Sequence, residues 1–157
     1  MMSDEYYMSR AIELAKKAAL LWEVPVGAVV VKKATGEIVG EGYNLRESEK
    51  DPLAHAELIA IREASRKLGG WRLTDCELFV TLEPCPMCCG AMINSRIERV
   101  VFGAYDGKAG SCGSVIDLFG LPYNHKPLTV GGVLEEECSA MLTDFFRELR
   151  SRRESGS

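Results

Sequence analysis

The chain of 157 residues lacks any apolar run approaching the roughly 20 residues that a membrane-spanning helix needs. It also lacks a strong charge of one sign, because its formal net charge is −4, and this disfavours non-specific coating of nucleic acid. The acidic N-terminus has no basic and apolar signal segment, and no repeat or low-complexity stretch follows it. We therefore expect a cytoplasmic protein without a membrane partner. A single domain is predicted over residues 1–157, with a flexible tail at 151–157.

A disulfide framework is not expected either, although the chain has six cysteines. Those that lie scattered in apolar or Gly-rich surroundings are Cys76, Cys89, Cys112 and Cys138. In a reducing compartment such thiols are small buried hydrophobic side chains. Only Cys85 and Cys88, three positions apart, form a pattern of their own.

Hydrophobic periodicity predicts alternating helices and strands. The predicted helices are 3–21, 54–68, 86–94 and 135–150, with a helical turn at 115–119. The predicted strands are 24–31, 38–43, 78–82, 100–104 and 128–134. The first two strands form an antiparallel hairpin, and a crossover lets the last two run parallel. The alternation predicts an α/β fold with a mixed, mainly parallel five-stranded sheet that helices cover on both faces.

Two short motifs carry the chemistry of the chain: H-A-E at 55–57 and P-C-P-M-C at 84–88. One imidazole and two thiolates suit zinc, and three ligands leave a fourth position open for water. We expect His55 in the first turn of one helix, with Cys85 and Cys88 in the first turn of another, where residues i and i+3 face the same way. Free N–H groups there lower the pKa of a thiol. The pattern predicts an open zinc site with one ion per chain.

Glu57 lies two residues after His55 and is not needed as a ligand. Residues i and i+2 of a helix diverge by about 200°, so the two side chains do not normally share a direction. Near a helix start the carboxylate can lie over the open position, take a proton from water and pass it to a leaving group. The alternative is an exposed helix carboxylate, and the spacing alone leaves both interpretations open.

A different class of protein would use cysteines alone. A closed zinc site of Cys85, Cys88, Cys89 and Cys112 would make the chain a structural binding module. Adjacent Cys88 and Cys89 do not easily point at one ion, and a closed site leaves the H-A-E motif unexplained. The open site is therefore favoured.

Both motifs resemble the signature of the zinc-dependent cytidine/deoxycytidylate deaminase superfamily. The stretches that resemble its tRNA-specific adenosine deaminase branch are E-V-P-V-G-A-V at 23–29, A-H-A-E at 54–57, V-T-L-E-P-C at 80–85, S-R-I at 95–97, V-V-F-G-A at 100–104 and D-F-F-R at 144–147. The resemblance covers about residues 4–150. It implies a cytidine-deaminase-like three-layer α/β/α fold and a homodimer.

The resemblance implies hydrolytic deamination of adenosine to inosine at the wobble position of a tRNA anticodon, in bacteria mainly an arginine tRNA. Water attacks C6 of adenine at a zinc ion held by His55, Cys85 and Cys88. Glu57 carries the proton to the ring nitrogen and then to the departing ammonia. The base must leave its stack, which costs little in a single-stranded anticodon loop. A deaminase of free guanine, cytosine or nucleosides is the alternative enzyme, because it would use the same zinc chemistry.

Substrate contacts are predicted at Val26, Asn44, Asp106 and Phe145, and those of Asn44 and Asp106 are implied by the resemblance. Asn44 matches a residue that hydrogen-bonds the target nucleotide, and its alternative interpretation is a turn asparagine. Asp106 matches a family position that contacts the sugar of a neighbouring nucleotide. The alternative interpretation is that Asp106-Gly107 forms a turn. Phe145 or the phenylalanine after it offers a ring to a base, while helical periodicity places one or both rings in the core.

Overall fold

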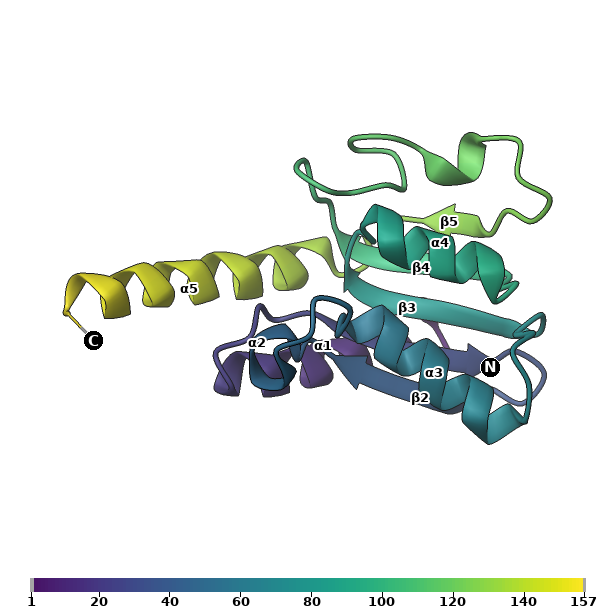
Figure 1. The fold of residues 1–157 in the computed structure, drawn as a ribbon, viewed down its shortest axis with the longest axis horizontal. Helices are drawn as coiled ribbons and strands as arrows, with labels where there is room; N and C mark the ends of the chain where they lie inside the picture. Colours follow the sequence, from purple (N-terminus) through teal and green to yellow (C-terminus); the bar gives the residue numbers. More distant parts are fainter. Residues whose placement is uncertain (1, 157) are drawn as a thin grey trace.

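The structure, a computed structural model, describes residues 2–156 and contains a five-stranded sheet between helices (Figure 1). The strands are β1 (Gly27–Lys32), β2 (Glu37–Tyr43), β3 (Cys76–Leu82), β4 (Arg99–Ala104) and β5 (Leu128–Val130). The helices are α1 (Asp4–Leu20), α2 (Arg46–Glu49), α3 (Ala56–Leu68), α4 (Pro86–Asn94), α5 (Glu135–Glu154) and the 3-10 helix η1 (Leu118–Gly120). Within residues 2–156, none of the helices combines the length and the hydrophobicity needed to span a bilayer.

The sheet is mixed, as predicted, and its strand order is β2-β1-β3-β4-β5. β1 is antiparallel to both β2 and β3, whereas β3, β4 and β5 are parallel to one another. Both the predicted hairpin and the parallel crossover from β4 to β5 are confirmed. The sequence did not predict that β1 would lie between β2 and β3. This insertion makes β1 the one strand of the described sheet that opposes the other four.

Helices cover both faces of the sheet, which confirms the three-layer α/β/α fold. Neighbouring residues of one strand point to opposite faces. Val30 of β1 packs in the core beneath α3 and α4, and Val29 packs in the core beneath α1 and α5. The sheet is therefore buried on both sides, and its carboxyl-end edge is the place left open for a site.

The close approach of α3 to β2 depends on Gly42. A Cβ atom at this position would lie 2.4 Å from the carbonyl oxygen of Ala56, the first residue of α3. Any larger residue would push the start of α3 away from the sheet. Gly42 thus fixes where His55, the residue before α3, is placed.

Several element boundaries differ from the prediction. The strand predicted at 128–134 ends at Val130, and the turn predicted at 115–119 forms as η1. α2 was not predicted, because its four residues are polar and none of them is buried. α5 ends at Glu154, so the first part of the predicted flexible tail is helical, and Figure 1 shows α5 extending away from the sheet. The division into one domain and a flexible tail stays a prediction.

Candidate metal centre

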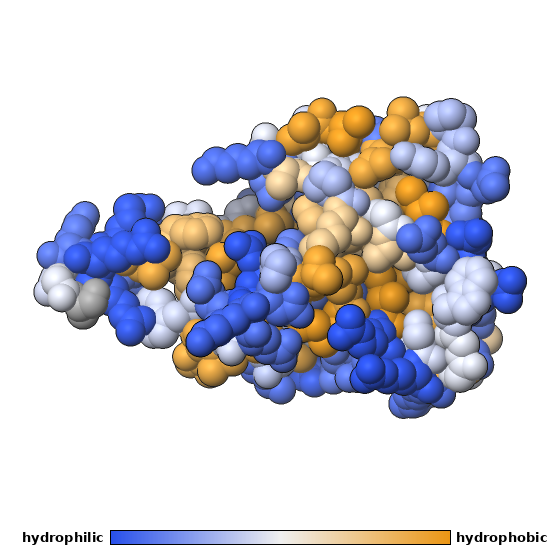
Figure 2. All heavy atoms as spheres, in the orientation of Figure 1, coloured by the Kyte–Doolittle hydropathy of each residue, from blue (hydrophilic) through white to orange (hydrophobic). Residues whose placement is uncertain are grey.

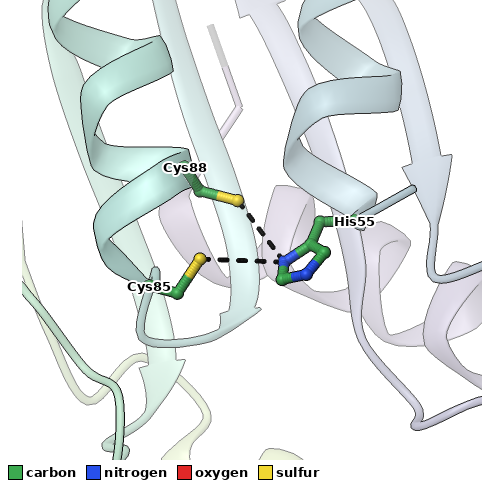
Figure 3. Close-up of side chains that lie close together, drawn as sticks. All are labelled: His55, Cys85 and Cys88. Carbon is green, nitrogen blue, oxygen red and sulfur yellow. Dashed lines mark hydrogen bonds between the residues drawn. The ribbon is translucent and has the colours of Figure 1, made fainter. Parts of the chain in front are cut away.

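The three predicted ligands converge from the N-termini of two helices (Figure 3). His55 is the N-cap of α3, Cys85 is the N-cap of α4, and Cys88 lies in the first turn of α4. We expected His55 and Cys85 inside their first helical turns, but each lies one residue earlier, with extended backbone angles. Pro86 occupies the first position of α4, where a proline loses no helical hydrogen bond.

The spacing of the three side chains fits a zinc ion. Nδ1 of His55 lies 3.6 Å from Sγ of Cys88 and 3.8 Å from Sγ of Cys85, and all three ligand atoms are within 4.8 Å of one another. Tetrahedral zinc, with bonds of about 2.3 Å to sulfur and about 2.0 Å to nitrogen, separates the two atoms by roughly 3.5 Å. The donor set and its geometry therefore match a three-ligand zinc site with one position to spare.

The closed all-cysteine site is not what the structure shows. Sγ of Cys89 lies 3.6 Å from Sγ of Cys112, and the Cys89 thiol also contacts the carbonyl oxygen of Pro84. Among residues 2–156, the side chains close enough to hold a metal together are those of His55, Cys85 and Cys88. Cys89 and Cys112 form a separate thiol pair outside the ligand cluster.

Local contacts prepare one thiol for metal binding. The hydrogen bond with Cys88 lowers the pKa of Cys85 to about 4, burial opposes this shift, and His55 adds to it. The same contact and burial raise the pKa of Cys88. A thiolate is the form of cysteine that binds a metal, so Cys85 is ready to coordinate a cation without first losing a proton.

Glu57, the second residue of α3, is buried beside these ligands. Its side chain is 4% exposed, so the alternative of an exposed helix carboxylate does not hold. The pKa of Glu57 is raised to about 7, mainly by burial and also by the nearby Cys85 charge, while a hydrogen bond from its own backbone N–H and the His55 charge oppose the shift. A carboxyl group whose pKa is near neutrality can both accept and return a proton.

A pocket of about 600 Å³ opens over this centre. His55, Glu57 and Cys85 are among the residues that line it. The remaining lining residues are Val24, Val26, Asn44, Arg46, Leu82, Glu83, Tyr105, Asp106, Gly107, Lys108, Ala109, Leu142 and Phe146. Three of the four predicted substrate contacts therefore face the same cavity as the candidate metal centre.

Asn44 and Asp106 each combine a structural role with a place in the pocket. Oδ1 of Asn44 accepts the N–H of Ala56 at 3.0 Å, and its Nδ2 donates to the carbonyl of Val24 at 3.2 Å. Oδ1 of Asp106 accepts the N–H of Lys108 at 2.9 Å, which forms the turn that the sequence suggested as the alternative. These bonds hold both side chains in fixed positions at the pocket wall.

Phe145 is the exception among the predicted contacts. Its ring is 7% exposed and packs against Trp22, while Phe146 is 41% exposed and lines the pocket. Helical spacing explains the difference, because Phe146 follows Leu142 by four positions and shares its side of α5. Of the two rings, Phe146 and not Phe145 lines the pocket, and a ring contact with a base stays a prediction. The sequence also missed Arg46 and Lys108, whose only signal was a positive charge near a predicted site.

The fold and the site together define a class of protein: three-layer α/β/α proteins with an open zinc centre at two helix N-termini and a buried glutamate beside it. Residues 1–104 match the family described as the cytidine and deoxycytidylate deaminase zinc-binding region, and the chain belongs to this family. The family and the ligand cluster identify zinc as the cofactor, with one ion per chain.

Comparison with individual proteins gives a narrower likeness. The chain is 52% identical over 156 residues to the tRNA-specific adenosine deaminase of Bacillus subtilis (strain 168), covering 99% of this chain and 96% of that protein. A solved structure from a study of A-to-I editing by tRNA:A34 deaminases superposes with a TM-score of 0.83 at 38% identity, covering 87% of this chain and 99% of the other. Guanine deaminase from Bacillus subtilis superposes with a TM-score of 0.64 at 36% identity, covering 82% and 84%.

Proposed function

We propose that this protein is a zinc-dependent hydrolase that converts adenosine to inosine at the wobble position of tRNA anticodons and releases ammonia. The observation that carries the proposal is an open three-ligand centre beside buried Glu57, at a pocket of about 600 Å³. The family membership supports deamination. The full-length likeness to a tRNA-specific adenosine deaminase supports an RNA adenosine as the target.

The chemistry divides between the metal and the side chains around it. His55, Cys85 and Cys88 would hold the zinc ion, which would lower the pKa of water and so supply a nucleophile at neutral pH. Glu57 would take a proton from the attacking water and deliver it to the adenine ring nitrogen as the water oxygen bonds to C6. It would then move the proton of the new C6 hydroxyl to the amino group, which leaves as ammonia when the C6–N bond breaks. Asn44, whose amide is fixed by Ala56 and Val24, offers its second N–H to the nucleotide.

The pocket mouth supports a polynucleotide as the substrate. Arg46 and Lys108 place positive charge at the rim, where the phosphates of a splayed nucleotide would pass. Phe146 and Tyr105 are 41% and 54% exposed at the same pocket, which suits stacking of a base. A free base has no phosphates and no neighbouring bases, so it would leave these groups unused.

A direct competition of substrates tests the proposal. The purified protein is incubated with an anticodon stem-loop RNA that carries adenosine at the wobble position, and in parallel with free guanine, cytosine and nucleosides. Inosine in the RNA and ammonia in solution are measured, with the same RNA carrying guanosine at that position as the matched control. We expect inosine in the adenosine stem-loop alone. Ammonia from free guanine or cytosine, without inosine in the RNA, would overturn the assignment.

Three narrower features belong to the same proposal. In bacteria the family resemblance favours an arginine tRNA, which is therefore the first stem-loop to test. The cytoplasm, where tRNA is used, is the proposed location.

A homodimer is also proposed, and the exposed apolar side chains near η1 support it: Val115, Ile116, Leu121 and Tyr123. Figure 2 shows hydrophobic surface over the loop that follows β4. Ile116→Lys should lower the mass measured by sedimentation equilibrium from that of a dimer to that of a monomer.

A further inference from the structure

Glu83 is a buried acidic residue for which the sequence suggested no role. Its side chain is 2% exposed, and it lies two residues before Cys85. Oε1 accepts the N–H of Asp106 at 3.0 Å, and Oε2 accepts the N–H groups of Cys112 at 3.0 Å and Ser114 at 3.1 Å. The hydroxyl of Ser114 donates a fourth hydrogen bond to Oε1. One carboxylate thus binds three backbone positions spread over nine residues.

The segment that Glu83 binds has little regular structure of its own. Between the end of β4 and the start of η1, the described chain forms turns and one isolated bridge, from Cys112 to Asp117. Backbone groups that are not paired in helices or strands need other partners, and a buried carboxylate supplies several at once. Residues 105–109 of this segment form a wall of the pocket.

Gly110 shows how closely the segment is fitted to the carboxylate. A Cβ atom at this position would lie 2.4 Å from Cδ and 2.5 Å from Oε1 of Glu83. The backbone therefore approaches the carboxylate at a distance that glycine alone permits. Nearby, the N–H of Ser111 donates to the carbonyl of Pro84 at 2.8 Å, which joins the same segment to the chain that leads to Cys85.

We infer that Glu83 is a positioning residue, which holds the wall formed by residues 105–109 in the shape that binds the nucleotide. Glu83 acts through this wall and takes no part in zinc binding or proton transfer. It therefore sets the affinity for the RNA substrate more than the rate of the chemical step. This inference rests on the proposed function, because the affinity concerned is that for an anticodon loop.

Glu83→Gln is the first test. Glutamine keeps the shape of the side chain but replaces one acceptor oxygen with an NH₂ group, which then faces N–H donors. We expect KM for the stem-loop RNA to rise about tenfold or more, since hydrogen bonds to a charged group are stronger than neutral ones. We also expect kcat to stay within about threefold and the zinc content to stay at the wild-type value, because the metal centre is untouched. Hydrogen exchange at the amides of Asp106, Cys112 and Ser114 should become faster.

Gly110→Ala is the second test. It tests the positioning role of Glu83 even if the Glu83→Gln variant does not fold. The added methyl would meet both the Glu83 carboxylate and the carbonyl oxygen of Asp106, each 2.4 Å from the new Cβ, so it forces the carboxylate and the wall apart without changing any charge. It should raise KM and speed the same amide exchange in the same direction as Glu83→Gln. Gly70→Ala is the matched control, because a Cβ there meets no atom within 4 Å and Gly70 lies outside the pocket.

The outcomes separate this inference from the function on which it rests. An inactive wild-type protein on every stem-loop would overturn the function, while the exchange rates would still show whether Glu83 orders the segment. With an active wild type, an unchanged KM in both variants would overturn the positioning role. Loss of zinc, or a fall in kcat alone, would contradict it too, because Glu83 would then support the metal or the chemistry instead of the pocket wall.

Discussion

The part of the pocket that holds the metal ligands (the metal half) and the part that faces the substrate (the substrate half) are stabilised by different interactions. His55 and Cys85 cap helices α3 and α4, whose inner faces pack into the main hydrophobic core, and Cys88 is itself part of that core. The substrate half includes α2, which buries no residue, and the segment after β4, which polar contacts hold in place. The chemistry therefore lies on the rigid part of the fold, and recognition lies on segments that hydrogen bonds keep in shape.

Two buried carboxylates hold the substrate half. Glu23, which is 2% exposed, accepts the N–H of Glu47 at 3.1 Å, the N–H of Ser48 at 2.6 Å and the hydroxyl of Ser48 at 2.7 Å. It fixes α2 in the way that Glu83 fixes the opposite wall. Changes in the metal half should therefore abolish catalysis, whereas changes in the substrate half should weaken binding by degrees.

The largest effect is expected for Cys88→Ala. Removing one of three zinc ligands should release the metal and abolish measurable turnover, and it should destabilise the fold because metal binding contributes to folding. Zinc per chain, measured by elemental mass spectrometry, checks this directly. Cys89→Ala is the matched control and should keep about one zinc, since Cys89 is buried next to Cys88 but contacts Cys112. Full zinc in Cys88→Ala, or zinc loss in Cys89→Ala, would contradict the ligand assignment.

Glu57→Ala should separate metal binding from catalysis. We expect about one zinc per chain to remain, because Glu57 is outside the ligand cluster. Turnover of the stem-loop RNA should fall by roughly 10² to 10⁴, the range for loss of a general acid–base group. Glu63→Gln, at an exposed position of the same helix, should keep nearly wild-type turnover. If the alanine variant loses its zinc, Glu57 is a ligand and not a proton carrier.

Phe145 and Phe146 are adjacent, so they allow an effect on substrate binding to be compared with an effect on stability. Phe146→Ala should raise KM by roughly 5-fold to 150-fold, since stacking of one base contributes about 1–3 kcal/mol, and should change stability little. Phe145→Ala should lower the free energy of unfolding by about 3 kcal/mol, because it removes a buried ring. Urea unfolding measures the change in stability of both variants, and steady-state kinetics measures the change in KM. The reverse pattern would return the substrate contact to Phe145.

The smallest effect is expected for Glu23→Gln, and it should depend on pH. Burial alone would raise the pKa of Glu23, but hydrogen bonds from Ser48 and Glu47 outweigh it and lower the pKa below the ordinary value of 4.5. The carboxylate therefore stabilises the fold above the unfolded-state pKa, and this contribution disappears as the pH falls through the lowered folded-state pKa. Urea unfolding at pH 7 should show a loss of about 1–2 kcal/mol in the variant. The difference should shrink below about pH 4, and a difference that is equal at all pH values would refute the account.

The sequence predicted the metal half well because its signals are local. Each of the motifs at 55–57 and 84–88 spans only a few residues, and periodicity placed each motif at a helix start. The substrate half depends on contacts between distant residues. Glu83 reaches Ser114, and Glu23 reaches Ser48, yet nothing in the neighbouring sequence distinguishes either glutamate from a surface residue.

The strand order of the sheet and the buried side of α5 also depend on contacts between distant residues. β1 pairs with β3 across more than 40 residues, and no local pattern shows that it lies between β2 and β3. In α5, periodicity placed the two adjacent rings near the core but did not decide which of them is buried. The structure decides it, because α5 turns Phe145 toward Trp22 and leaves Phe146 at the pocket.

Inosine mapping on total tRNA tests the central claim most directly. Bacterial tRNA without inosine is incubated with the purified protein, and sequencing then records every adenosine that reads as guanosine. We expect conversion at the wobble position of tRNAs with adenosine there, and none with Glu57→Ala protein. Conversion at adenosines throughout the tRNA pool, or no conversion by zinc-loaded wild-type protein, would contradict it.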